Sequence, residues 1–186
     1  MQANQVNTDT TAENFGSVGI FVAMLLIGLF LTVIGIFSAE GGEDSAIAML
    51  IIGIVLLIIA KIYFLVLLYR TWRFAINESH RHNLVPSIDT PGKAVGFLFI
   101  PFYNWYWVFQ AFGKLPKDLN AIAKAKESST TMSEGIGTSL AVMILLSIIP
   151  IIGYITAIIS LIIAPIFISQ SIELSKNLSL IVKTAE

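Results

Sequence analysis

The sequence contains no cysteine and has few charged residues. The lack of cysteine excludes a disulfide framework, a thiolate nucleophile and a metal site built on thiolates. Charged residues make up 12% of the chain, about half the share of an average soluble domain. Eleven basic residues against twelve acidic ones leave a net charge of −1, which gives no sign of a nucleic-acid partner.

Hydrophobic residues, by contrast, make up 56% of the chain, and the mean hydropathy is +0.84. A soluble fold of this length cannot bury so much apolar surface, because too little of a small protein is interior. We therefore predict an all-α integral membrane protein. Residues 1–14 form a polar tail without Lys or Arg, and the apolar run after it is too long for a signal peptide, so this run is expected to remain as a membrane span.

Residues 15–175 are predicted to form a single membrane domain, followed by a polar, partly helical C-terminal tail over residues 176–186. A spanning helix needs about 20 apolar residues. The apolar run 135–172 would be about 57 Å long as one helix, so Pro150 and Gly153 are expected to make a tight turn between two helices. The four predicted transmembrane helices cover residues 16–38, 46–69, 136–149 and 154–172.

Residues 94–113 are apolar but crowded with aromatic side chains, and Pro101 interrupts them. Trp and Tyr prefer the level of the lipid head groups, where the ring is dry and its polar atom is wet. We predict a re-entrant or interfacial segment. In the alternative, Asn104 caps a half-helix and the broken backbone lines a cavity, as in transporters. The predicted interfacial anchors are Tyr103, Trp105, Tyr106 and Trp107.

The distribution of basic residues predicts the topology, because Lys and Arg gather on the cytoplasmic side. The loop 40–44 has none, whereas residues 70–93 and 114–134 carry several. All basic loops lie on one side if residues 94–113 enter the membrane and return. The alternative is a five-span protein in which this segment crosses. We predict a multi-pass protein of the bacterial inner membrane with both termini in the cytoplasm.

Leu115, Leu119 and Ile122 recur with helical spacing, which predicts an amphipathic helix over residues 115–127 at the membrane surface. Basic side chains around it either mark the topology or bind anionic lipid head groups, and the two interpretations are compatible. Lys114 and Lys126 belong to this basic cluster. The candidates for head-group binding are Arg70, Arg73, Arg81, Lys93, Lys117 and Lys124.

Lys61 lies inside the second predicted span. A charge at the bilayer centre costs roughly 2.5–3.5 kcal/mol, and such residues are often functional. Lys61 is about 13 Å along the helix from Arg70, so its long stem is able to snorkel to the interface. The alternative is an ion or proton role, with Glu173 as a partner. Lys61, Asn104 and Glu173 form the candidate intramembrane polar site, with Gln110 as a further lining residue.

The string NESHRH places Glu78, His80 and His82 close together, but no third strong metal ligand lies nearby, so no metal is predicted. The chain has no nucleotide-binding loop and no hydrolase or metalloprotease motif. We expect no cofactor and no enzymatic activity. A membrane enzyme acting on lipid is a weaker alternative that depends on this cluster.

The segment from Gly92 to Trp107 contains Gly-x-x-x-Gly followed by Pro-aromatic-x-Asn-aromatic, and KLPKDLN comes soon after it. In these motifs, and in the order of its elements over residues 60–175, the chain resembles an uncharacterised family of bacterial multi-span membrane proteins with a domain of unknown function. The resemblance implies an architecture and brings no activity.

Two functional hypotheses follow. The first is a non-enzymatic membrane subunit that scaffolds or accompanies a larger membrane assembly or forms a homo-oligomer, since its spans carry few ionisable groups and many small residues that favour close packing. The second is a small channel or transporter. Its polar cavity would be lined by Lys61, Asn104, Gln110 and Glu173. Membrane lipids and other membrane subunits, or further copies of the chain, are the expected partners.

Overall fold

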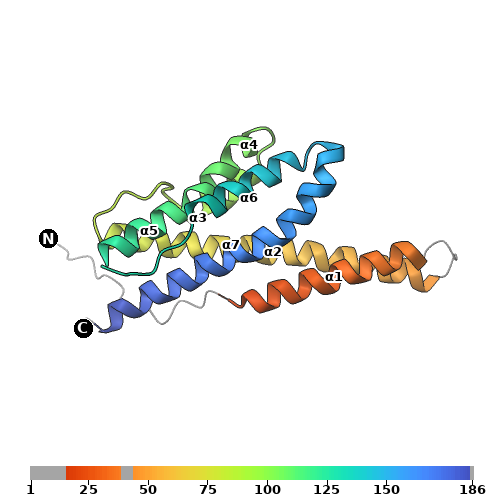
Figure 1. The fold of residues 1–186 in the computed structure, drawn as a ribbon, viewed down its shortest axis with the longest axis horizontal. Coiled ribbons are helices and arrows are strands. Elements are labelled where there is room, and N and C mark those ends of the chain that lie inside the picture. The colour runs from red at the N-terminus through yellow and green to blue at the C-terminus, as the bar shows by residue number, and fades with distance from the viewer. Residues whose placement is uncertain (1–15, 39–43, 185–186) are drawn as a thin grey trace.

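The computed structural model describes residues 16–38 and 44–184, and every regular element within these ranges is helical (Figure 1). This confirms the all-α prediction. The predicted N-terminal tail lies outside the described residues. The elements are α1 (Val18–Ser38), α2 (Asp44–Arg81), α3 (Pro91–Gly96), the 3-10 turn η2 (Phe97–Phe99), α4 (Tyr103–Val108), the π-helical turn η3 (Phe109–Gly113), α5 (Leu115–Ala125), α6 (Glu134–Leu146) and α7 (Pro150–Thr184).

Three helices are long and apolar enough to cross a membrane, namely α1, α2 and the stretch Ile155–Ile181 of α7. Only 17% of the most apolar window of α1, and the same share for α2, is buried inside the protein. Such a surface is stable only in lipid, so the protein is membrane-embedded. Helix α6 is apolar but has 13 residues, about 20 Å against a hydrocarbon core of about 30 Å. The fourth span, over residues 136–149, stays a prediction.

Helices α1 and α2 form a closely packed antiparallel hairpin. Glycines on both helices permit the close approach. A Cβ atom at Gly35 would lie 2.7 Å from the backbone nitrogen of Leu50, and one at Gly53 would lie 2.6 Å from that of Thr32. Small residues at helix contacts are the usual means of close packing in lipid.

Helix α2 runs well beyond the span predicted over residues 46–69, because nothing breaks it before the loop that contains Pro86. Its C-terminal half is the centre of the protein core, where Leu67, Leu68 and Trp72 are fully buried. The Trp72 indole nitrogen donates a hydrogen bond of 2.9 Å to the carbonyl oxygen of Ala111. This half of α2 therefore positions the aromatic segment.

Residues 91–113 form a hairpin that turns at residues 100–102 (Figure 1). We call it the aromatic hairpin. Thr90 caps its first helix, and Pro91 occupies the first turn, where no backbone N–H is needed. The turn contains Pro101 and places Phe102 at a φ of +61°. The Trp107 indole nitrogen donates to the Ala94 carbonyl oxygen at 3.2 Å. The outgoing and returning limbs are thus joined by a buried hydrogen bond.

Residues 147–149 divide the long apolar run 135–172 into two helices, and Pro150 begins α7. The prediction that Pro150 and Gly153 form the turn is wrong in position: both residues lie inside α7, because proline fits the first turn of a helix. Helix α7 contains Pro165 and changes direction along its length (Figure 1). It continues to Thr184, so the segment predicted as a C-terminal tail is helical up to that residue. Burial stabilises this last part of the helix, since Leu174 and Leu178 are covered by the rest of the protein.

Helix α5 ends at Ala125, two residues before the predicted boundary, and its apolar face is covered by protein. Leu115, Leu119 and Ile122 are fully buried, and α5 packs on α2, α7 and η3. The amphipathic pattern was a correct indicator of the helix. The partner of its apolar face is the helical core, in place of the membrane surface that the sequence suggested.

Candidate functional site: a cavity between the helices

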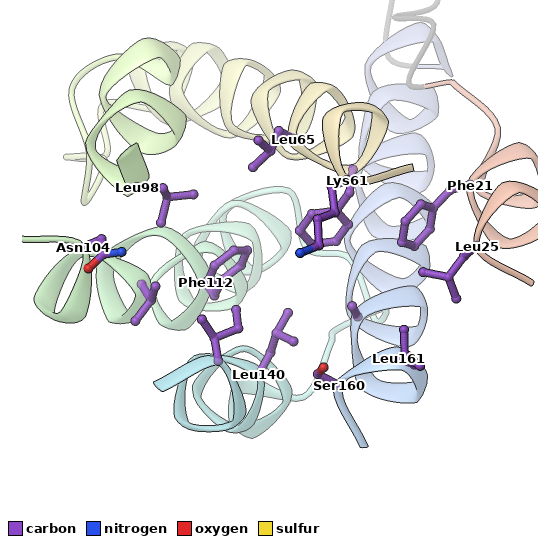
Figure 2. Close-up of a pocket in the computed structure, with 14 residues that line it drawn as sticks. Phe21, Leu25, Lys61, Leu65, Leu98, Asn104, Phe112, Leu140, Ser160 and Leu161 are labelled. Atoms are coloured by element: carbon purple, nitrogen blue, oxygen red, sulfur yellow. The ribbon is translucent and has the colours of Figure 1, made fainter. Parts of the chain in front are cut away.

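A cavity of about 430 Å³ lies where α1, α2, the aromatic hairpin, α6 and α7 meet (Figure 2). Protein interiors contain few voids larger than a water molecule, and ligand sites typically measure about 300–1,000 Å³. The cavity is lined by Phe21, Leu25, Lys61, Phe64, Leu65, Leu98, Asn104, Val108, Phe112, Leu140, Ile144, Ser160, Leu161 and Ala164.

Only three of these fourteen residues are polar, and they enter the cavity from different walls. The ammonium group of Lys61 points into it from α2, and the amide of Asn104 reaches it from α4 (Figure 2). The Asn104 Oδ1 atom is buried and has no hydrogen-bond partner in the described part of the chain. The Ser160 hydroxyl donates to the carbonyl oxygen of Ala157 at 2.7 Å. Two polar groups are therefore available to a ligand.

The structure brings together two of the four residues expected to line a polar cavity. Lys61 and Asn104 share the site, whereas Gln110 and Glu173 do not line it. Gln110 is half-buried in the η3 turn, and Glu173 is exposed on α7. Glu173 is thus no lining partner for Lys61, because the face of α7 that lines the cavity carries Ser160 and Ala164.

The four predicted aromatic anchors differ in exposure. Tyr103, Trp105 and Tyr106 are exposed, with 41% to 57% of each residue accessible, whereas Trp107 is 9% exposed. The Trp107 ring stacks on Tyr103 with centroids 5.6 Å apart and meets the edge of Phe97 at 4.7 Å. The Trp107 indole N–H donates its hydrogen bond to the Ala94 carbonyl oxygen. Trp107 therefore holds the two limbs of the hairpin together, and the three other rings remain available to an interface.

The candidates for head-group binding lie around one end of the protein, formed by the end of α2, the loop after it and α5. We call this the basic end. Arg73, Lys117 and Lys124 are exposed there. Arg81 and Lys93 have acidic partners, since Arg81 pairs with Glu78 at 2.8 Å and Lys93 with Asp89 at 2.6 Å. Arg70 is half-buried and has its own interactions.

The sequence did not reveal the buried ion pair of the basic end. Lys126, expected among the surface lysines, contacts the Glu78 carboxylate, and both side chains are nearly inaccessible, at 3% and 5%. The Lys126 ammonium also donates to the Leu178 carbonyl oxygen at 2.9 Å. It therefore ties α5 to α2 and α7 at one point. The string NESHRH drew attention to Glu78 as a metal ligand, and no pattern marked its partnership with Lys126.

Asp118 is the second buried acid of the basic end, with 8% exposure. Its Oδ1 accepts from the Ser87 hydroxyl at 2.6 Å, and its Oδ2 accepts from the Ser87 backbone N–H at 2.8 Å. Burial raises the pKa of the Asp118 carboxyl above its ordinary value of 3.8, against the opposing effects of Ser87 and Lys114. The contact anchors the loop after α2 to α5.

The raised pKa of Asp118 predicts a specific pH dependence. The Asp118 carboxyl has a higher pKa in the folded protein than in the unfolded chain, where it is near 3.8. The folded protein therefore retains the proton at pH values at which the unfolded chain has lost it, and the stability that this group contributes falls as pH rises through the folded-state pKa. The Asp118→Asn variant retains an oxygen acceptor for Ser87 and does not titrate. We expect the melting temperature of Asp118→Asn, relative to wild type, to rise between pH 3.5 and pH 7. Thermal unfolding at both pH values measures this, and a constant difference would contradict the assignment.

Among residues 16–38 and 44–184, no group of three His, Cys, Asp or Glu side chains is placed to hold a metal ion. His82 lies 3.9 Å from Glu78, and His80 is exposed. Comparisons with family models, with curated proteins and with solved structures found no match. The resemblance to an uncharacterised membrane family is therefore still an expectation. The cavity is the structural feature from which we infer a function.

Proposed function

We propose that the chain is a small non-enzymatic carrier that holds its ligand in the cavity between its membrane helices. The observation that supports this is the convergence of Lys61 and Asn104 on one cavity of ligand size (Figure 2). Ionisable residues within membrane segments typically face a cavity and mark a substrate pathway. The mostly apolar lining favours a carrier over an ion channel, because a conducting pore needs a polar path across the membrane.

The topology that fits this function is the four-span one. Helices α1, α2, α6 and α7 would be the spans, with α6 short, and the aromatic hairpin would enter from the basic end and return. The support is the hairpin shape of residues 91–113 and the burial of Trp107 between its limbs. With the basic end in the cytoplasm of a bacterial cell, both termini would be cytoplasmic.

Labelling of introduced cysteines tests whether the cavity is open to water. Since the sequence has no cysteine, each single variant reports on one position. Ser160→Cys and Ala164→Cys place a thiol on the cavity wall, whereas Ile158→Cys and Ile162→Cys place it on the outer face of the same helix, where both residues are more than 60% exposed. We expect a membrane-impermeant methanethiosulfonate to label the first pair in intact membranes and to leave the second pair unmodified.

The positions on α7 form a matched set, because all four lie within two turns of one helix. Equal labelling at the wall and outer positions would mean that the reagent reports local unfolding and not the cavity. Absence of labelling at both Ser160→Cys and Ala164→Cys would contradict a carrier with an aqueous entrance.

The second candidate function, a subunit of a larger membrane assembly, is favoured by the α1–α2 arm. We define this arm as α1 with residues 44–58 of α2. It extends beyond the other helices (Figure 1), and its exposed side chains include Phe30, Val33, Ile36 and Phe37 on α1 and Ile51 and Val55 on α2. Such a surface contacts either lipid or another membrane helix.

Extraction in mild detergent tests whether the arm contacts only lipid or also another membrane protein. Mass measurement of the purified particle would show a foreign subunit in fixed proportion if the arm binds a partner, and two or more copies if the chain self-associates. A monomer of 20.3 kDa plus detergent would leave lipid as the arm's only neighbour and would remove this candidate.

A further inference from the structure

We propose that the ligand of the cavity is a long-chain fatty acid, whose carboxylate is bound by Lys61 while its single chain fills the apolar lining. The proposal rests on the carrier function above and adds the chemical class of the ligand to it. Three properties of the cavity support it, namely its charge, its lining and its size.

The charge of the cavity selects an anion. Lys61 is the one ionisable residue among the fourteen that line it, and none of them is acidic. An ammonium group in a surrounding of low polarity is stabilised by an opposite charge within hydrogen-bonding distance. One ammonium balances one negative charge, which matches a monocarboxylate. The Asn104 amide is a second polar group of the cavity, on another wall than Lys61 (Figure 2).

The lining selects a hydrocarbon chain for the rest of the ligand. Eleven of the fourteen lining residues are apolar, and they come from every element around the cavity, including Phe21 of α1, Phe112 of the hairpin and Leu140 of α6. An apolar cavity of this size gains about 0.8 kcal/mol for each methylene group that it removes from water. The chain thus supplies affinity, and the carboxylate fixes the orientation at Lys61.

The size of the cavity limits the ligand to one chain. A volume of about 430 Å³ lies near the lower end of the range for drug-sized ligands. It accommodates a single extended or bent acyl chain, but not the two chains and glycerol phosphate of a phospholipid. Lys61 is partly accessible from outside the protein, so the polar group of the cavity is within reach of an entering ligand.

Ligand counting by native mass spectrometry tests the proposal on the full-length protein, delipidated in a non-ionic detergent. We expect one palmitate per chain for wild type and weaker binding of hexadecanol, which has the same chain without the charge. Lys61→Met is expected to weaken palmitate binding about tenfold, corresponding to about 1.4 kcal/mol, and to leave hexadecanol unchanged. Lys61→Arg should retain palmitate. Lys176→Met, at an exposed position on α7 outside the cavity, is the matched control and should bind as wild type does.

The failures of the two proposals are distinguishable. If palmitate and hexadecanol bind equally and Ala164→Trp, which fills the cavity, blocks both, the carrier stands and the fatty-acid assignment is overturned. Tighter binding of dioleoyl phosphatidic acid than of palmitate overturns it as well. If neither ligand binds and the α7 cysteines are also unlabelled, the carrier function itself fails. Size-exclusion profiles and tryptophan fluorescence that match wild type show that each variant is folded.

Discussion

Replacing Gly137 by valine is expected to destabilise the protein by about 1–3 kcal/mol, and by more if the backbone cannot adjust. Gly137 lies on α6 where this helix meets the aromatic hairpin. A Cβ atom there would overlap the carbonyl oxygen of Phe112, and it would lie 2.9 Å from the carbonyl carbon. These are backbone atoms, so no side-chain rotation relieves the clash. Thermal unfolding in detergent, followed by tryptophan fluorescence, measures the loss.

Gly135 is the matched control, two residues earlier on the same helix. The nearest atom to an added Cβ is the Ser133 hydroxyl oxygen at 3.8 Å, so Gly135→Ala has room, and alanine in a helix is more stable than glycine by roughly 0.5–1 kcal/mol. The two substitutions should change the melting temperature in opposite directions. Equal melting temperatures for Gly137→Val and wild type would contradict the close contact between α6 and the hairpin.

The second large effect is expected from Lys126→Met, which leaves the Glu78 carboxylate buried with less compensation. Breaking a buried ion pair by removing one partner costs roughly 3–5 kcal/mol. Arg81 still contacts Glu78 at 2.8 Å, so we expect the lower end of this range. The lost hydrogen bond to the Leu178 carbonyl oxygen also loosens α7 from α5. Chemical unfolding of the purified variant measures the change in free energy of unfolding.

A double variant shows that the cost comes from the unpaired charge. Glu78→Gln combined with Lys126→Met removes both charges, and we expect it to recover most of the stability, because replacing both partners is often nearly neutral. Lys124→Met, at an exposed position two residues earlier in the last turn of α5, should lie within about 0.5 kcal/mol of wild type. A double variant as unstable as Lys126→Met alone would show that methionine does not fit the space.

The sequence predicts the helical elements well, because the periodicity and the length of apolar runs are local properties. The break at Pro101 and the division of residues 135–172 both follow from residues that interrupt a helix. The partner of each face is not a local property. Leu115, Leu119 and Ile122 make the same pattern whether lipid or protein covers them. Only the assembled protein shows that they are buried and that α5 packs on α2 and α7.

The candidate site was predictable in part for the same reason. Lys61 and Asn104 stand out as polar residues in apolar surroundings, so each was identifiable alone. Their meeting depends on the return of the aromatic hairpin beside α2, which the Trp72 and Trp107 hydrogen bonds maintain. Glu173 also stands out next to an apolar run but lies outside the cavity. It follows the predicted span 154–172, whereas Lys61 lies inside the span 46–69, so the sequence separates the two residues only by depth.

The contact between Lys126 and Leu178 joins segments that leave the ribosome at different times. Glu78, the hairpin and Lys126 are synthesised before the second half of α7, so the apolar face of α5 and the charges beside it lack their final cover until that helix follows. The late arrival of α7 also supplies the cavity wall that carries Ser160 and Ala164. Helix α7, which is synthesised after α1 to α6, therefore completes two separate parts of the protein: its residues 160–164 close the cavity wall, and Leu178 later closes the basic end.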